Sequence, residues 1–264
     1  DISVTGLVES PRVAELKRSH WHDIEEDVTD RTWLLRGSAL HYILQKGAER
    51  AGYLCEERIV VDFEGTKIAM KPDILSPEGI LSDFKDSTVY AVKLGGQDRW
   101  RWQLNIYRWG MERCNYKITA LENIVFLKDW NETESETRED YPPCNIVSLP
   151  VKILSDEDVE TYLRDRIALH KQARAGNLPD CTPDDRWQRE TTYAVKKKGN
   201  KRAMNGGKFA TLEEADAFQK LQTVETEIEY RPGRNLRCER NKCLVAQWCD
   251  QWAQIQAESE MEEF

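Results

Sequence analysis

The stretch KPDILSPEGILSDFK, residues 71–85, decides the fold, because it holds two strand signals and the charged side chains that those strands carry. A Pro-Glu-Gly turn signal at residues 77–79 separates two short apolar runs. The sequence therefore predicts one strand over residues 67–75, a tight turn, and a second strand over residues 80–85.

Two carboxylates and one ammonium group are expected to converge on these strands. Asp83 and Lys85 are two residues apart on one strand, so their side chains point to the same face. Asp73 ends the preceding strand, and pairing of the two strands brings it close to them. Two carboxylates form a hard-oxygen site that suits Mg²⁺ or Mn²⁺. Such an ion activates water against a phosphodiester, and a neighbouring lysine can orient that water.

Each of these motifs is common in ordinary surfaces when it occurs alone. An Asp-x-Lys triplet is usual on solvated strand edges, and a Pro-Asp pair is usual in turns. Their joint occurrence on adjacent strands favours a site. We therefore predict that Asp73, Asp83 and Lys85 are catalytic residues.

Helix and strand signals alternate on both sides of this stretch. Ser155 and Asp158 form a capping box at the start of the last helix of the predicted core. We predict an α/β fold, with a mixed central β-sheet flanked by helices. The expected helices span residues 31–52, 97–113 and 155–175, and the further strands span residues 57–63, 117–127 and 145–151.

Composition limits the class of protein. The chain has 264 residues, of which 40% are hydrophobic and 32% charged, as in soluble globular proteins. It shows neither an apolar run long enough to cross a membrane nor the layout of a secretory signal, so we expect a cytoplasmic protein. The net charge of −9 argues mildly against nucleic acid as a partner, although positive charge can be confined to one groove.

Positive charge is concentrated in the second part of the chain, after residue 178. Residues 191–209 read as a hairpin, and residues 211–221 read as a capped helix. We predict that this basic ββα unit binds DNA, the alternative being a solvated surface. The residues expected to contact DNA are Lys196, Lys197, Lys198, Lys201 and Arg202, and Lys208 adds to the positive charge of the unit.

Three regions follow from these patterns. We predict a core at residues 1–178, an inserted basic unit at residues 179–230, and a Cys-rich segment with an acidic tail at residues 231–264. The chain has seven cysteines, an odd number that points to a reducing compartment. Three of them are expected in the core, namely Cys55, Cys114 and Cys144.

The motifs in their order resemble those of the PD-(D/E)XK nuclease superfamily, in particular its RecB-like exonuclease branch, which includes AddB-type and CRISPR-associated nucleases. The resemblance adds a helical His41 before the strands and a Gln-x-x-x-Tyr motif, Gln103 to Tyr107, after them. It implies a restriction-endonuclease-like core in which a metal ion is held by His41, Asp73, Asp83 and the backbone carbonyl of Phe84. It also implies that Lys85 is catalytic, and that Gln103 and Tyr107 hold DNA or brace the site.

The same branch contains members with an iron–sulfur cluster held by one distant and three clustered cysteines. The resemblance therefore implies a 4Fe–4S cluster on Cys181, Cys238, Cys243 and Cys249. Two features depart from the family pattern: the first gap in the trio has four residues, and the distant cysteine follows the core. Structural zinc remains the alternative, although zinc sites usually have shorter gaps between paired cysteines. The basic ββα unit resembles integrase arm-binding domains.

Three functions are compatible with these residues. The first is a Mg²⁺- or Mn²⁺-dependent DNA exonuclease in recombination, repair or phage DNA processing, which would act in the host cytoplasm if phage-encoded. The others are an endonuclease of the same fold, for restriction or junction cleavage, and a non-catalytic DNA-binding or assembly protein. The expected partner is DNA, and a recombination, helicase or annealing protein and a homo-oligomer are both compatible with the resemblance.

Overall fold

Pro72 breaks the segment that the sequence predicts to be one strand over residues 67–75. In the computed structural model, which describes residues 1–239 and 242–262, this segment forms two strands, β4 (Thr66–Met70) and β5 (Ile74–Leu75). They belong to different sheets, because proline has no N–H with which to continue a ladder. The prediction of one continuous strand is therefore wrong, and Asp73 lies where the two sheets separate.

The first compact unit, Asp1–Pro179, contains both of these sheets. The smaller has the order β1-β4-β3, in which β3 (Ile59–Phe63) and β4 form an antiparallel hairpin and β1 (Ile2–Ser3) runs parallel to β4. The larger has the order β2-β5-β6-β7-β8. Its other strands are β2 (Leu54–Cys55), β6 (Ile80–Ser87), β7 (Ala120–Leu127) and β8 (Ile146–Val151).

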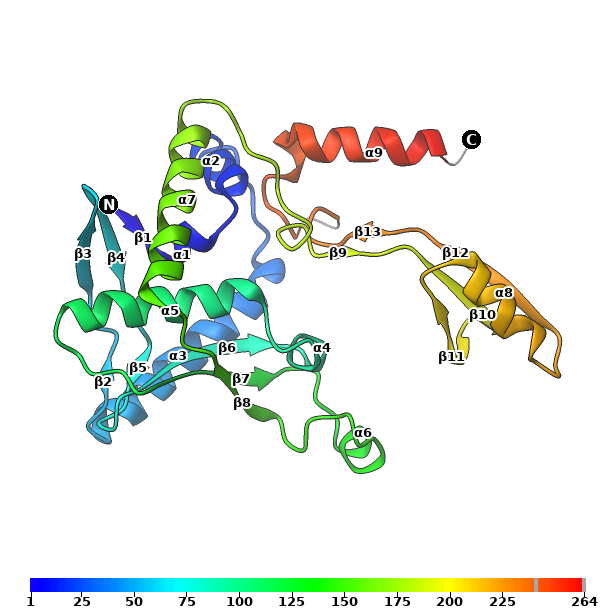
Figure 1. Ribbon diagram of the computed structural model, residues 1–264, viewed down its shortest axis with the longest axis horizontal. Coiled ribbons are helices and arrows are strands. Elements are labelled where there is room, and N and C mark those ends of the chain that lie inside the picture. The colour runs from blue at the N-terminus through cyan, green and yellow to red at the C-terminus, as the bar shows by residue number, and fades with distance from the viewer. Residues whose placement is uncertain (240–241, 263–264) are drawn as a thin grey trace. The chain divides into compact units, whose positions relative to one another are not determined.

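The five-stranded sheet is mixed, as predicted. Strands β6 and β7 are parallel, and the other neighbours are antiparallel (Figure 1). A parallel pair needs a long crossover connection. Here the crossover from β6 to β7 contains α4 (Val89–Lys93) and α5 (Asp98–Arg113). Helix α5 packs against both of these strands.

Helices lie on both faces of β6, which confirms the expected α/β layout. Side chains alternate along the strand, so Asp83 faces α5 and Phe84 faces the opposite helix, α3 (Thr32–Arg50). Gln103 of α5 donates a hydrogen bond to Asp83. On the other face, the rings of His41 and Phe84 meet edge to face, with their centroids 5.7 Å apart.

The core of this unit is formed largely by helices packed on the small sheet and on one another. Trp109 of α5 and Leu163 of α7 (Asp156–Arg174) are among its fully buried side chains. As predicted, Ser155 caps the N-terminus of α7, and its side chain accepts a hydrogen bond from the Asp158 N–H. Two N-terminal helices that the sequence analysis did not predict complete the unit, α1 (Val4–Val8) and α2 (Pro11–Ser19).

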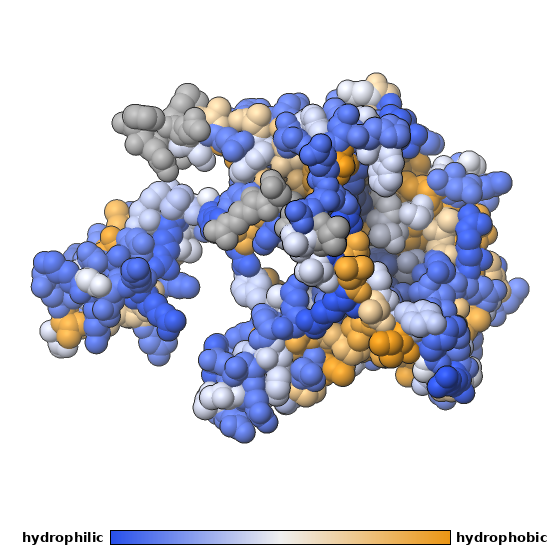
Figure 2. Space-filling model, turned by 180° about the vertical axis from the view of Figure 1, so that it is seen from behind, coloured by the Kyte–Doolittle hydropathy of each residue, from blue (hydrophilic) through white to orange (hydrophobic). Residues whose placement is uncertain are grey.

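Helix α3 forms where expected, but its apolar residues do not enter the core. None of its residues, all of which the structure describes, is buried. The side chains of Leu35 and Ile43 are 61% and 65% exposed. Figure 2 shows apolar side chains gathered at the surface of the first unit, where α3 lies. Helical spacing of apolar residues therefore indicated the helix correctly, while only the tertiary structure decided how much of it is covered.

The second unit, Asp180–Phe264, contains a three-stranded antiparallel sheet with one helix packed on it (Figure 1). The predicted hairpin is β10 (Thr192–Lys197) and β11 (Ala203–Phe209), and the predicted helix is α8 (Leu212–Lys220) with its complete capping box. The structure adds β12 (Thr226–Arg231), which pairs with β10 and gives the order β11-β10-β12.

The remaining described elements are short except for the C-terminal helix. They include η1 (Val28–Arg31) and α6 (Glu132–Thr137) in the first unit, and in the second β9 (Gln188–Arg189), β13 (Arg234–Asn235), η2 (Ala246–Trp248) and α9 (Asp250–Glu262). Among the helices of the described part of the chain, none combines the length and the apolar character needed to span a membrane. The division of residues 179–264 into two regions stays a prediction.

Candidate functional site

Asp73 is held at the separation of the two sheets by a backbone hydrogen bond. Its Oδ2 accepts from the Phe84 N–H of the neighbouring strand at 2.6 Å. The same oxygen lies 3.5 Å from His41 Nδ1 of α3. The hydrogen bond with Asp73 raises the pKa of His41, as do the charges of Asp73 and Asp83. The strand, its neighbour and the helix thus bring three predicted site residues together.

Asp83 is a buried carboxylate whose negative charge is only partly compensated by the nearby Lys85. Its side chain is almost completely buried, and burial raises its pKa to about 6, with the charge of Asp73 acting in the same direction and Lys85 opposing it. Oδ1 accepts a hydrogen bond from Gln103 Nε2, and Oδ2 forms an ion pair with Lys85. A buried carboxylate with a raised pKa beside a second carboxylate is typical of a cation site.

Gln103 connects the charged groups on the α5 side. Its Oε1 accepts from Lys85 Nζ at 3.0 Å, and its Nε2 donates to Asp83 Oδ1 and to the Tyr107 hydroxyl, each at 3.1 Å. Burial and the charge of Asp83 raise the pKa of Tyr107, so this residue stays a neutral phenol. Tyr107 is only 3% exposed, a position from which it braces Gln103.

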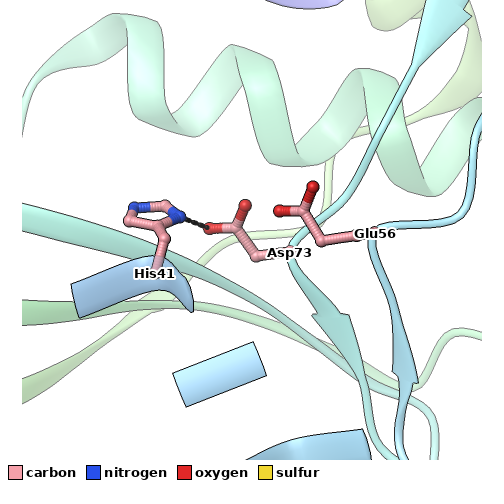
Figure 3. Close-up of side chains that lie close together, drawn as sticks. All are labelled: His41, Glu56 and Asp73. Carbon is pink, nitrogen blue, oxygen red and sulfur yellow. Dashed lines mark ion pairs between the residues drawn. The ribbon is translucent and has the colours of Figure 1, made fainter. Parts of the chain in front are cut away.

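Glu56 is a neighbour of this site that the sequence analysis missed. It follows β2, and its carboxylate lies with the Asp73 carboxylate and the His41 ring so that one ligand atom of each falls within 4.8 Å of the others (Figure 3). Among the described residues this is the one such group of three. Glu56 belongs to no motif, since it reaches Asp73 through pairing of β2 with β5 rather than through spacing in the chain.

The donor set fits a hard divalent cation. Imidazole nitrogen and carboxylate oxygens are ligands of Mn²⁺, and carboxylates are those of Mg²⁺. Asp73 connects the two halves of the site. It contacts His41 of α3, and it accepts a hydrogen bond from the N–H of Phe84, the residue after Asp83. The arrangement can hold a cation between α3 and β6 while Lys85 is kept beside Asp83.

A second cluster forms in the second unit, where the four C-terminal cysteines approach one another. Burial, and after it the charges of Cys243, Cys181 and Cys249, together raise the pKa of Cys238 to about 12. The side chain of Gln251 bonds both to the N–H and to the C=O of Cys181, at 2.8 and 3.1 Å. These bonds tie the residue two positions after Cys249 to the distant cysteine.

The spacing of these thiols bears on the choice between zinc and a cluster. Four thiolates around one zinc ion lie about 3.8 Å apart, given a Zn–S distance near 2.3 Å. Among the described residues, no three of the sulfurs lie within 4.8 Å of one another. Of the other three cysteines, Cys114 and Cys144 are exposed and Cys55 is half-buried, so the expectation that these are core residues is wrong.

The basic hairpin is partly neutralised by the strand that the sequence analysis did not predict. Lys196 lies 3.3 Å from Glu227 and 3.8 Å from Glu229 of β12, and Lys198 pairs with Glu225. The other three predicted DNA-binding residues of the hairpin are exposed and form no ion pair with any residue that the structure describes. They are Lys197, Lys201 and Arg202.

Solved structures that are similar to this chain include the crystal structure of SSO0001 and an alkaline exonuclease. No family model matches the chain, and no curated protein matches it. The crystal structure of SSO0001 is 17% identical with a TM-score of 0.48, over 70% of this chain and 79% of that one. An alkaline exonuclease, LHK-Exo from Laribacter hongkongensis, is 12% identical with a TM-score of 0.37, over 68% of this chain and 95% of that one.

The buried charge of Asp83 leads to a stability prediction for the metal-free protein. Its folded pKa of about 6 lies above the ordinary 3.8, so the folded chain binds a proton there more tightly than the unfolded chain. The resulting penalty is absent near pH 4 and complete above about pH 6. We expect Asp83→Asn to raise the free energy of unfolding at pH 7 by about 1–3 kcal/mol, and to lose this advantage near pH 4.

Urea unfolding in EDTA at both pH values measures this effect. Asp73→Asn is the matched control, because Asp73 accepts the Phe84 N–H and contacts His41, and its replacement should give no gain. A loss of stability in Asp83→Asn at pH 7 would contradict the prediction.

Proposed function

We propose that this chain is a metal-dependent DNA exonuclease that hydrolyses phosphodiester bonds in recombination, repair or phage DNA processing. The observation that carries the proposal is the approach of Asp73 and Asp83 from adjacent strands, with Lys85 bonded to Asp83 and Gln103. The order of these residues in the sequence resembles that of the RecB-like nucleases. Hydrolysis of a phosphodiester by this set of groups is the chemistry that best uses all of them.

The residues present fit a Mg²⁺ or Mn²⁺ ion. His41, Asp73, Asp83 and the backbone carbonyl of Phe84 would hold it, and the burial of the Asp83 carboxylate within reach of the charge of Asp73 supports this assignment. When bound, the ion would supply Lewis acidity toward the phosphodiester and lower the pKa of water. Without a cation, burial and to a smaller extent the charge of Asp73 raise the pKa of Asp83, against the opposing charge of Lys85.

Lys85 is placed to act on the attacking water or on the charge that develops in the transition state. Asp83 and Gln103 both hold its ammonium group, so Nζ has a fixed position before substrate arrives. A fixed ammonium lowers the reorganisation needed during the reaction. Gln103 and Tyr107 are positioning residues in this proposal, since their hydrogen bonds are made to Lys85, Asp83 and each other.

The activity is tested with end-blocked circular DNA and linear DNA in the presence of Mn²⁺. An exonuclease degrades linear DNA and leaves the circle intact, whereas an endonuclease cuts both. A preparation that binds both DNAs and cuts neither would support the third alternative, a non-catalytic DNA-binding protein. We expect degradation of linear DNA alone.

Two variants assign roles within the site. We expect Asp83→Ala and Lys85→Ala each to lower the rate by a factor of about 100 or more, because both act on the reacting groups. Calorimetric titration with Mn²⁺ separates them: Asp83→Ala should lose affinity, while Lys85→Ala should keep it, since an ammonium is no ligand. Lys128→Ala, on the exposed surface, is the control for rate. Near-normal cleavage by Asp83→Ala would remove the site from consideration.

We also propose that the basic hairpin of the second unit supplies DNA affinity. The ion pairs of Lys196 and Lys198 with β12 reduce the charge that these two lysines can offer. Lys197, Lys201 and Arg202 are therefore expected to contribute most. Salt dependence measures this contribution, because each phosphate contact adds about 0.9 to the slope of log affinity against log salt.

The hairpin prediction compares two variants of the full chain in an Asp83→Ala background, so that DNA is not cut. Changing Lys197, Lys201 and Arg202 together to Gln should flatten the slope on duplex DNA by about 2–3. Changing Lys196 and Lys198 to Gln should flatten it by less, because those charges are already paired. Equal slopes in all three proteins would make the hairpin an ordinary solvated surface.

The four cysteines of the second unit are proposed to hold one metal centre, a 4Fe–4S cluster in preference to zinc. Their approach around Cys238 supports a single centre, and the resemblance to the RecB-like branch favours the cluster over zinc. The centre would join Cys181 to the three cysteines that follow the basic unit, and so close that unit into a loop. Its role would be structural.

Anaerobic purification tests the cysteine site. We expect a brown protein with broad visible absorbance and about four iron and four sulfide per chain. Cys249→Ser should lose the colour and lower the stability of the second unit, whereas Cys144→Ser, which changes an exposed cysteine outside the cluster, should do neither. A colourless protein with one zinc would exclude the cluster, and four titrating thiols in the native protein would exclude any metal.

A further inference from the structure

The backbone at Glu56 is held in a conformation that is costly for a residue with a side chain. Its φ is 54°, in the left-handed region, which costs a non-glycine residue about 1–2 kcal/mol. The Glu56 N–H donates to the carbonyl oxygens of both Pro72 and Asp73, at 3.1 and 3.2 Å. These bonds fix the residue after β2 against the Pro-Asp dipeptide, and so bring its side chain next to the carboxylate of Asp73.

The Glu56 carboxylate has neighbours of two kinds. His41 and Asp73 are the potential metal ligands, with ligand atoms of the three residues within 4.8 Å of one another. Lys71 is the cationic neighbour, which forms an ion pair with Glu56 and whose side chain is 58% exposed. The metal-free protein therefore neutralises Glu56 with an ammonium group at the border of the solvent.

We propose that Glu56 is a ligand of the divalent ion and that Lys71 is its counter-ion in the metal-free state, which the ion displaces. This inference rests on the proposed metal site. The donor set of imidazole and two carboxylates suits Mn²⁺. Oxygen ligands of an octahedral ion lie about 3–4.2 Å apart for bonds near 2.1 Å. A small closing movement would therefore place all three side chains around one ion.

The balance of charge supports the exchange. Glu56, Asp73 and Asp83 offer three carboxylates, while Lys71 and Lys85 provide two ammonium groups. Lys85 is held by Asp83 and Gln103 in the interior, whereas Lys71 is largely in solvent and can leave without burying a charge. An ion pair at such an exposed position is worth about 0–1 kcal/mol, so a divalent cation competes with it easily.

The first test measures Mn²⁺ affinity by calorimetry and by the electron paramagnetic resonance signal of free Mn²⁺, without any assay of activity. We expect Glu56→Gln to weaken binding by about tenfold or more, because even groups that only support a ligand contribute this much. Glu57→Gln is the matched control. Glu57 is the next residue in the chain and is exposed, and its carboxylate accepts a hydrogen bond from the Tyr116 hydroxyl. Its replacement should therefore leave the Mn²⁺ affinity unchanged.

The second test uses Lys71. If this lysine competes with the ion, Lys71→Gln tightens Mn²⁺ binding by about two- to fivefold in the wild-type background. In the Glu56→Gln background it should tighten binding by less, because the carboxylate for which the two cations compete is gone. A purely structural ion pair would give no gain in affinity from Lys71→Gln. Thermal unfolding followed by circular dichroism establishes that each variant is folded.

The outcomes separate this inference from the proposed function. Wild-type protein that binds no Mn²⁺ would overturn the proposed metal site and this inference with it. Wild-type protein that binds Mn²⁺ and loses affinity in Asp83→Ala, but not in Glu56→Gln, would leave the nuclease proposal intact and overturn the role of Glu56.

Discussion

The hydrogen bond from the Phe84 N–H to Asp73 Oδ2 joins the two halves of the candidate site. Asp73 could not make it from within a continuous strand, because its side chain would then follow the alternation of the ladder. Pro72 interrupts that ladder, so β4 enters one sheet and β5 enters the other. The carboxylate is left at the separation between them, where α3 brings His41 and β2 brings Glu56. One imino acid thus fixes the place of the first carboxylate.

The second half of the site depends on an uninterrupted strand. Asp83 and Lys85 lie in the middle of β6, whereas Asp73 lies at a break between two strands. Regularity places both on the α5 face, and the neighbouring β7 pairs with every residue from Ile80 to Ser87. A rigid strand can hold a carboxylate in a buried position that a loop would let relax into solvent. The raised pKa of Asp83 is the energetic result, and the network of Gln103 and Tyr107 keeps the two charged groups in place.

Charge in the second unit is organised by strand pairing. The basic hairpin has no acid within its own turn, yet its lysines are opposed by glutamates from β12, about thirty residues later in the chain. Pairing of β10 with β12 sets Lys196 directly opposite Glu227. A net charge of −9 and a local run of lysines are therefore both incomplete descriptions of the surface that a nucleic acid would meet.

The sequence by itself determined the features that depend on a few neighbouring residues. These include the helix caps at Ser155 and Thr211, the common face of Asp83 and Lys85, and the mixed sheet flanked by helices. Only the tertiary structure decided the split at Pro72, the exposure of α3, and the approach of Glu56 to Asp73. The physical reason is the distance along the chain over which each interaction acts. Helix caps and the alternation of side chains on a strand depend on residues at most four positions apart. The split at Pro72, the exposure of α3 and the approach of Glu56 depend on which distant strands pair and which helix faces are covered.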